Sequence, residues 1–484
     1  MATYPMNPVD AAWYHMDGPA NFAIVTAMLL TKKPLGFAKV RAVLEHRLAV
    51  IDRFRQRVVE RGLPLATPHW EDVPDFDIGQ HLHHVALPAP RDQSALTALV
   101  DDIASSPLPR ERPLWQAHVV DGVEGGSALI MRYHHCIGDG AAMMTVARRL
   151  FDDSPRARPV DPIGVDSEAG KNVLTSAFEA VERSSREMLA ATAAALDAVT
   201  HPQVLIDKAG LALEGAGVLL AELLKSPDPK SPFKGEFGMR QRVAWSKPVA
   251  IADVKAAGAP FRAKVNDVLV AVVAGALRAY LARRGVDVDH TTVRAIVPVD
   301  LRPPERAGEL GNEFGLVILD LPVAIHGGMQ RMTATKARMD ALQRSPEAVG
   351  MRLLLDIFGR GPKPLEDVAQ SLFGSKASLV MTNVAGPTKT LYLAGVPIAR
   401  MMFWVPHPGD QLGMGISIMS YGGMASLALI ADARLVPDPQ VITDEFNREF
   451  AQMHERLKVG MAKLAEKKRR GARPSIQPRR SDTA

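Results

Sequence analysis

The stretch RYHHCIGDGAAMM (Arg132–Met144) places the first constraint on the fold. It overlaps the end of an apolar run, SALIMRYHH (Ser127–His135), that has the composition of a buried β-strand. It also overlaps the start of AAMMTVARRLF (Ala141–Phe151), whose apolar spacing is that of an amphipathic helix. Two adjacent histidines therefore end a strand, and an aspartate between glycines leads into a helix. This order is typical of an α/β lobe.

The two histidines are expected to differ in role. Side chains alternate across a strand, so His134 and His135 face opposite ways, and one can line a cavity while the other packs backward. Gly138 and Gly140 permit a tight turn with a close approach of backbones. Asp139 between them can orient a histidine or accept a hydrogen bond from the backbone or an arginine. A lone His-His pair is more often structural than catalytic. The combined pattern of strand, His-His, Asp-Gly and helix is much more specific than the pair alone.

Length and composition indicate a two-lobed globular protein. The chain has 484 residues, of which 47% are hydrophobic and 23% charged. Its net charge is +5, and Lys467–Arg480 alone carries seven basic residues and no acidic one. Because the rest is close to neutral, a nucleic-acid-binding surface is not indicated.

Other features bear on the compartment. Cys136 is the only cysteine, which excludes an intrachain disulfide and favours a reducing compartment. The N-terminus lacks the basic start and apolar core of a signal peptide. The longest apolar run, Val268–Leu277, is shorter than the ~20 residues that span a bilayer. We expect a cytoplasmic protein, and the basic end suggests peripheral contact with the inner membrane face or with lipid droplets as a further hypothesis.

Changes of composition divide the chain into four segments. Residues 1–152 are predicted to form an N-terminal lobe and residues 237–466 a C-terminal lobe, both alternating strand and helix patterns. Residues 153–236 between them read as a linker with an Ala- and Leu-rich helical part, for which packing on the protein is favoured over contact with lipid. Residues 467–484 are predicted to be a disordered basic tail.

The motif HHCIGDG (His134–Gly140) matches the HHxxxDG motif of acyl-CoA-dependent acyltransferases, a superfamily that includes chloramphenicol acetyltransferase and peptide-synthetase condensation domains. Seven further blocks occur in the order found in bacterial wax ester synthase/diacylglycerol acyltransferases, so the chain resembles that family over nearly its whole length. The blocks are MNPVDAAWYHMDGP (Met6–Pro19), RERPLW (Arg110–Trp115), VNDVLVAVVAGALRAYL (Val265–Leu281), VPVDLRP (Val297–Pro303), GNEFG (Gly311–Gly315), TNVAGP (Thr382–Pro387) and SYGG (Ser420–Gly423). Asp300 departs from the serine that is common in the family.

The resemblance implies both a fold class and an activity. The fold would be α/β, with two chloramphenicol-acetyltransferase-like lobes, each a mixed sheet with helices, joined by a helical linker. The activity would be O-acyl transfer from long-chain acyl-CoA to an alcohol. A diacylglycerol acceptor gives triacylglycerol, and a fatty alcohol acceptor gives a wax ester. Acyl-CoA is then a substrate, and neither a cofactor nor a metal is expected.

The family assigns the general base to the second histidine, which is His135 here. An imidazole with a pKa of ~6.5 can take the proton of an alcohol while the carbon–oxygen bond forms. The departing thiol has a pKa of ~8.5 and needs little acid assistance, so one base is enough. The resemblance implies that Asp139 holds the loop. The part played by His134 is less defined, because it faces the other way.

Several residues outside the motif are candidates for supporting roles. Asn266 begins an apolar helix and could donate to the thioester oxyanion, although capping of that helix by Asn266 and Asp267 explains the pair equally well. Trp115, Thr382 and Asn383 are weak candidates for substrate binding. Trp115 is expected to pack inside the lobe, and the other two are expected to shape the crossover between lobes.

Three alternatives accompany this interpretation. The Cys136 thiol could form an acyl-enzyme, but strand alternation turns it away from His135 and the superfamily uses direct transfer. The chain could be a condensation-type acyltransferase with a carrier-bound acyl donor. It could also be a non-catalytic lipid-surface binding protein that has kept the fold.

Overall fold

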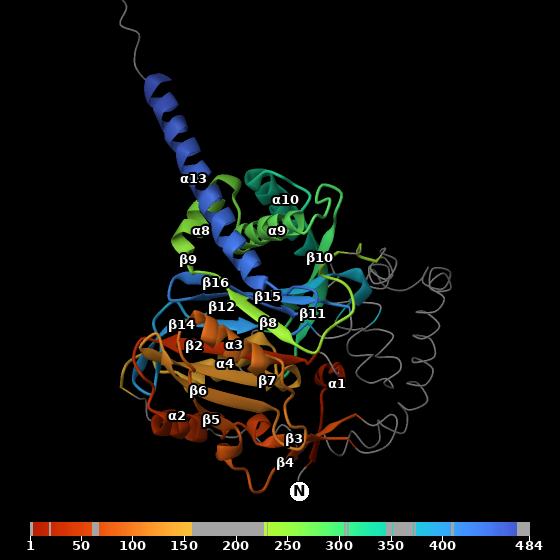
Figure 1. The fold of residues 1–484 in the computed structure, drawn as a ribbon, viewed down its shortest axis with the longest axis vertical. Helices are drawn as coiled ribbons and strands as arrows, with labels where there is room; N and C mark the ends of the chain where they lie inside the picture. The colour runs from red at the N-terminus through yellow and green to blue at the C-terminus, as the bar shows by residue number, and fades with distance from the viewer. Residues whose placement is uncertain are drawn as a thin grey trace, which may run out of the picture.

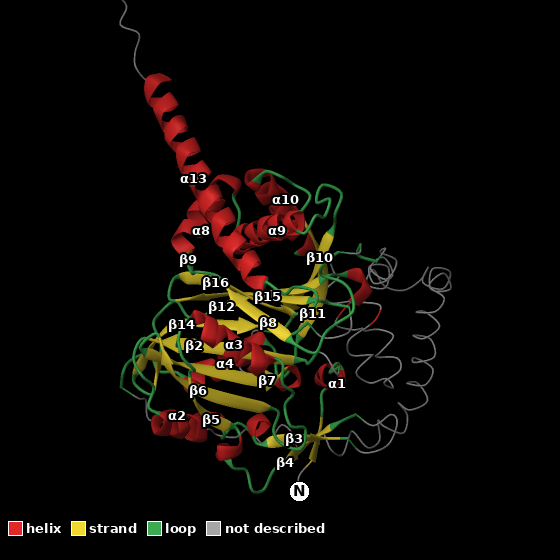
Figure 2. Ribbon diagram, in the orientation of Figure 1, coloured by secondary structure: helices red, strands yellow, loops and turns green. Residues whose placement is uncertain are grey.

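The computed structural model describes residues 3–18, 21–60, 67–156, 227–229, 231–303, 306, 309–344, 351, 371, 374–407 and 411–471. Within these residues the chain forms two α/β lobes, each built on a mixed sheet with helices against it (Figures 1 and 2). The expected α/β fold with two lobes is confirmed. The helical part predicted between the lobes lies outside the described residues.

The sheet of the first lobe has six described strands in the order β13-β14-β2-β7-β6-β5. β7 is antiparallel to both of its neighbours, and β5 runs parallel to β6. Most residues of β7 are buried whichever face they point to, which explains its nearly continuous apolar sequence. The strands span Ile24–Thr31 (β2), Leu82–Ala86 (β5), Trp115–Val123 (β6), Gly126–His134 (β7), Tyr392–Leu393 (β13) and Val396–Trp404 (β14).

Strand β14 joins this first sheet although it comes from late in the chain. It pairs antiparallel with β2, with Trp404 opposite Thr26 and Ile398 opposite Thr31. The range 237–466, predicted as the C-terminal lobe, therefore contributes β13 and β14 to the sheet of the N-terminal lobe. This exchange covers an edge of β2 that would otherwise present unpaired backbone groups, and no single point in the sequence separates the lobes.

The remaining described parts of the first lobe surround that sheet (Figure 1). Its helices are Pro8–His15 (α1), Phe37–Val43 (α2, continued by a π-helical turn, Leu44–Leu48), Gln93–Ala104 (α3) and Gly140–Leu150 (α4). Single 3₁₀ turns lie at Asp52–Phe54, Ile78–Gln80 and His135–Ile137 (η4). A small separate sheet joins Thr3–Pro5 (β1), His69–Asp72 (β4) and Gln56–Val59 (β3).

The second lobe has a larger mixed sheet in the order β11-β10-β12-β15-β16-β8, with β9 also paired to β16. The pairs β10–β12 and β12–β15 are parallel, and the other pairs are antiparallel. The strands span Gln241–Trp245 (β8), Val249–Ala250 (β9), Val293–Asp300 (β10), Phe314–Leu321 (β11), Leu379–Ala385 (β12), Met414–Tyr421 (β15) and Met424–Asp432 (β16).

Helix α9 (Val265–Arg283) forms the centre of the second lobe, next to α8 (Ile251–Gly258), α10 (Gly328–Leu342) and α13 (Pro439–Gly471). It is the one described helix that is long and apolar enough to cross a bilayer. However, 78% of its most apolar window is buried inside the protein. A helix that is apolar on all sides and packed on all sides is a core helix.

Helix α13 changes one expectation. It begins at Pro439, and the Thr443 hydroxyl donates to the Gln440 carbonyl inside its first turns. It continues to Gly471 and extends away from the lobe (Figure 1). The first residues of the segment 467–484, predicted to be disordered, are therefore helical, and residues 472–484 lie outside the described part.

The two sheets meet through an apolar core that both lobes share. Met402 and Trp404 of β14 pack with Val243 and Trp245 of β8, and Ile430 of β16 joins the same cluster. The rings of Trp245 and Trp404 meet edge to face with centroids 5.8 Å apart. This is a favoured geometry for aromatic pairs, so the junction between lobes is packed like a domain interior.

Candidate active site

His135 is held at the junction of the two lobes. It opens the turn η4 directly after β7, and its amide donates to the Ala23 carbonyl at 2.7 Å. Its own carbonyl accepts a 2.8 Å hydrogen bond from Asn312 Nδ2 of the second lobe. The imidazole stacks on the Trp13 ring of α1, with centroids 4.0 Å apart and planes 16° apart. Backbone and ring of His135 are therefore both fixed before any substrate arrives.

The His135 side chain lines a cavity of about 490 Å³ between the lobes. The first lobe contributes residues of α1, β7 and α4, and the second lobe contributes residues of β10, β11 and β12, with Phe403 from the exchanged strand. Most of the walls are apolar, as in Met16, Ile296, Leu316 and Val380. A largely apolar cavity with a few convergent polar groups is the usual form of a site for an apolar substrate.

Burial sets the protonation state of His135. Removal from water lowers the pKa of its imidazole to about 4, and the neighbouring His134 acts in the same direction. The His135 carbonyl and the Asn312 side chain oppose this shift but do not cancel it. At neutral pH the ring is uncharged and free to accept a proton.

His134 lies behind the cavity and does not line it. Its Nδ1 accepts a 3.2 Å hydrogen bond from the Cys136 amide, and its Nε2 lies 3.3 Å from Asp17 Oδ1. Since Nδ1 accepts, Nε2 is the nitrogen that carries a proton toward Asp17. Burial raises the pKa of Asp17, but its contacts with His134 and with the Ala23 amide outweigh burial and lower it. The structure thus places His134 where it holds the turn, with no surface on the cavity that His135 lines.

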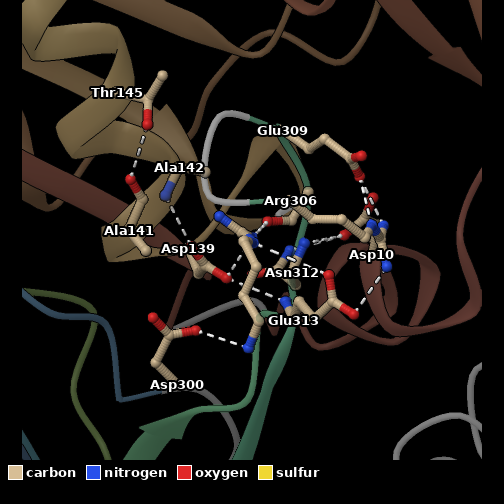
Figure 3. Close-up of polar contacts among 12 residues, drawn as sticks. Asp10, Asp139, Ala141, Ala142, Thr145, Asp300, Arg306, Glu309, Asn312 and Glu313 are labelled. Carbon is tan, nitrogen blue, oxygen red and sulfur yellow. Dashed lines mark hydrogen bonds and ion pairs between the residues drawn. The ribbon is translucent and has the colours of Figure 1, made fainter. Parts of the chain in front are cut away.

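Asp139 connects the start of α4 to the second lobe (Figure 3). One carboxylate oxygen accepts from the Ala142 amide at 2.9 Å and caps the helix. The other accepts from Arg302 Nη2 at 2.8 Å and from the Glu313 amide at 2.9 Å. Burial raises the pKa of Asp139, and these donors partly offset that rise. These contacts fix the loop to α4 and to the second lobe.

The glycines around Asp139 allow the two lobes to touch backbone to backbone. Gly138 forms an isolated bridge with Gly311, and a Cβ on Gly138 would lie 2.9 Å from the Cβ of Ala142. Gly311 has φ of +106°, a conformation that side chains disfavour. The predicted close approach at Gly138 is therefore present. At Gly140 a Cβ would meet only Val384, at 3.4 Å.

Asn312 and Asp10 form a second polar link between the lobes (Figure 3). The Asn312 backbone amide and Nδ2 both donate to Asp10 Oδ1, at 2.9 and 2.8 Å. Burial raises the pKa of Asp10 to about 6, although hydrogen bonds from Asn312 and the charge of Arg53 act against it. Asp10 is therefore mostly ionised at neutral pH.

The other predicted site residues fall into two groups. Thr382 and Asn383 line the cavity, whereas Asn266, Asp267 and Trp115 do not. Asn266 Oδ1 accepts from Asn383 Nδ2 at 2.8 Å, so it reaches the cavity only through that residue. Asp267 accepts from the Lys264 amide at 2.8 Å and thus caps α9. The indole of Trp115 is buried, with its Nε1 donating to the Phe54 carbonyl at 2.8 Å.

The thiol of Cys136 is poorly placed for nucleophilic attack. It is fully buried and does not line the cavity beside His135. Burial raises its pKa, and the nearby carboxylates of Asp10 and Asp17 raise it further. A buried thiol with a raised pKa is unreactive, because the thiolate is the nucleophile.

The side chains of Trp13, Arg302 and Asn312 contact the HHCIGDG turn, although the sequence predicted no role for them. Each lies in a block that carries the family resemblance: AAWYH, VPVDLRP and GNEFG. The order of those blocks identified them as a set. Their spacing along the chain gave no indication that all three meet the HHCIGDG turn.

Comparison with known proteins agrees with this arrangement. The chain matches the wax ester synthase/diacylglycerol acyltransferase catalytic domain over residues 6–269 and the WS/DGAT C-terminal domain over residues 310–454. A putative diacylglycerol O-acyltransferase of Mycobacterium tuberculosis is 28% identical over 473 residues, which is 93% of this chain and 90% of the relative. A probable diacylglycerol O-acyltransferase of the same species is 28% identical over 82% of this chain and 83% of its own length.

Solved structures show the same fold. The wax ester synthase/diacylglycerol acyltransferase from Marinobacter aquaeolei VT8 superimposes with a TM-score of 0.67 at 21% identity, covering 94% of this chain and all of that one. The first condensation domain of the calcium-dependent antibiotic synthetase gives a TM-score of 0.59 at 18% identity, covering 94% of this chain and 97% of the domain. Such low identities establish the two-lobed architecture alone.

The two-lobed fold with HHCIGDG at the lobe junction defines an acyl-CoA-dependent acyltransferase of the HHxxxDG class. Within that class, the chain belongs to the wax ester synthase/diacylglycerol acyltransferase family. It is an O-acyltransferase. The carrier-bound donor and the non-catalytic role are not favoured.

Proposed function

We propose that this enzyme transfers a long acyl chain from coenzyme A directly to the free hydroxyl of diacylglycerol, with His135 as the general base. The observation that carries the proposal is the position of His135, as a neutral imidazole on the wall of an apolar cavity between the lobes. The names of the mycobacterial relatives support diacylglycerol as the acceptor. Wax ester formation from a fatty alcohol is the second candidate within the same family.

The proposed chemistry needs only this base. As the acceptor oxygen attacks the thioester carbonyl, His135 takes the hydroxyl proton, and negative charge develops on the thioester oxygen. The buried imidazolium is costly by itself, which is why its pKa is low. It forms next to an oxyanion of opposite charge, and each stabilises the other in a site of low dielectric. Collapse of the intermediate releases the thiolate, which takes the proton back from His135.

The proposed reaction needs no cofactor, because acyl-CoA supplies an activated acyl group. Location in the cytoplasm, with peripheral contact at a membrane or lipid-droplet surface, stays a prediction from the sequence.

The acceptor can be identified by following thiol release from palmitoyl-CoA with dipalmitoylglycerol or hexadecanol. We expect release that depends on dipalmitoylglycerol, with triacylglycerol as the product on thin-layer chromatography. Release with hexadecanol alone would make the protein a wax ester synthase instead. Release with neither acceptor, by protein with a cooperative melting transition, would contradict the proposal.

The pH dependence of kcat/KM should report the buried state of His135. The base is active when unprotonated, so a pKa lowered to about 4 keeps roughly nine-tenths or more of the neutral-pH rate at pH 5.5. A histidine with an ordinary pKa of ~6.5 would keep roughly one-tenth. The measurement is a profile with palmitoyl-CoA from pH 4.5 to 8. Loss of half of kcat/KM near pH 6.5 would contradict the expectation. An acid limb near pH 6 that disappears in the Asp10→Asn variant would be assigned to titration of Asp10.

A further inference from the structure

Asn312 uses its hydrogen-bond donors to connect helix α1 with the catalytic turn. Its backbone amide donates to Asp10 Oδ1, and its Nδ2 donates to Asp10 Oδ1 and to the His135 carbonyl, both at 2.8 Å. The opposite orientation of the amide would place its oxygen against two acceptors. The orientation of the Asn312 side chain is therefore determined by Asp10 and by the backbone of His135.

This orientation leaves one acceptor atom of Asn312 and one ring nitrogen of His135 buried and without partners. Asn312 Oδ1 and His135 Nδ1 are both buried, and neither has a hydrogen-bond partner among the described residues. The His135 carbonyl and, to a smaller extent, the Asn312 side chain favour the protonated form of the imidazole. That is the effect of an acceptor oxygen, and not of an N–H donor. Buried polar atoms without partners are uncommon, and a pair of them at a reactive site calls for a functional explanation.

We propose that Asn312 is a positioning residue for the base: its amide oxygen accepts the Nδ1 proton of His135 and so keeps the Nε2 lone pair directed at the acceptor hydroxyl. Nδ1 is buried, so Nε2 is the nitrogen that can meet substrate. Asp10 acts one step further back, because it orients Asn312. Asn312 belongs to the second lobe and Asp10 to the first, so the base is correctly oriented only when the lobes are joined. The inference rests on His135 being the base in the proposed function.

Charged and titratable groups surround this arrangement on several elements. They are Asp10 on α1, Arg53 near Asp10, His134 on β7, Asp139 before α4, Arg302 after β10, and Glu313 beside Asn312. A change of pH profile in a variant is therefore assigned to His135 only with matched controls.

The test compares Asn312→Ala with His135→Ala and with Glu309→Gln, which breaks an exposed ion pair to Arg306 on the same loop. We expect Asn312→Ala to lower kcat roughly 10- to 100-fold, the loss that a base misplaced by about 1 Å produces. KM for palmitoyl-CoA should stay within about threefold of the wild-type value, since no substrate contact is removed. Glu309→Gln should behave as wild type.

A second variant keeps the test decisive if Asn312→Ala does not fold. Asp10→Asn/Asn312→Asp exchanges the amide and the carboxyl, keeps the net charge and places a carboxylate oxygen against His135 Nδ1. The acid limb of its kcat/KM profile should move to higher pH by about one unit or more, as an adjacent carboxylate raises an imidazole pKa. A purely structural role for Asn312 would leave the limb in place.

The outcomes separate this inference from the proposed function. The inference is overturned if Asn312→Ala keeps kcat within about twofold of wild type, or if the exchange variant has the wild-type acid limb. If His135→Ala is inactive in that experiment, the base assignment survives without Asn312. If His135→Ala itself remains active, the proposed function fails at its base.

Discussion

Replacing His135 by alanine is expected to reduce kcat by roughly 10²- to 10⁴-fold, the range that general acid–base catalysis contributes. Of the described histidines, His15 and His135 line the cavity, and His135 is the buried one, with a lowered pKa. KM for palmitoyl-CoA should change little, because the apolar walls that bind the acyl chain remain. The measurement is thiol release from palmitoyl-CoA with dipalmitoylglycerol as acceptor.

The neighbouring histidine supplies the matched control. His134→Gln alters a side chain that faces Asp17 and the Cys136 amide, behind the cavity. We expect it to lower the melting temperature while retaining most of kcat. If the two substitutions reduced kcat equally, the division between a base and a positioning histidine would be wrong. If His135→Ala kept a tenth or more of the wild-type kcat, His135 would not be the base.

The second large effect concerns stability. Asp139→Asn should lower the free energy of unfolding by about 3–5 kcal/mol, the cost of breaking a buried ion pair from one side. The side chains of Arg302 and Asp139 are only 2% and 8% exposed. The substitution would replace Asp139 Oδ2, which accepts two hydrogen bonds, by an amide nitrogen. That nitrogen is a donor, and it would face the Arg302 guanidinium and the Glu313 amide. Urea denaturation followed by tryptophan fluorescence gives the free energy.

A paired variant identifies the cause of that loss. In Asp139→Asn/Arg302→Met the buried cation that has lost its Asp139 partner is removed as well, so we expect part of the lost stability to return. Losses that simply add in the double variant would mean that the two side chains do not interact energetically. A loss below about 1 kcal/mol for Asp139→Asn would place this contact among ordinary surface ion pairs.

Local patterns predicted local structure well in this chain. The apolar run before His134 is β7, and the helix expected at Ala141 begins at Gly140. The long apolar segment that starts at Val265 is helix α9. Asp267 caps this helix, and capping was one of the two roles considered for Asn266 and Asp267. In each case the residues that determine the element lie within the element or next to it.

Contacts between distant segments could not be predicted in the same way. The exchange of β14 depends on a free edge of β2, about 370 residues earlier, and no periodicity within Val396–Trp404 specifies that partner. The link from Asp10 through Asn312 to His135 joins three separate parts of the sequence. The family resemblance brought all three blocks together, but the roles of Asp10 and Asn312 are apparent only from their hydrogen bonds.

Because β14 lies late in the chain, the first sheet can be completed only late in synthesis of the protein. At ~5–20 residues per second, β2 leaves the ribosome roughly 20 to 75 s before the strand that covers its edge. For that interval the apolar nascent sheet has an unpaired border, which is a template for association with other chains. The N-terminal lobe, which carries His134 and His135, therefore cannot finish folding while it is being made. Its maturation has to wait until more than four-fifths of the chain has been translated.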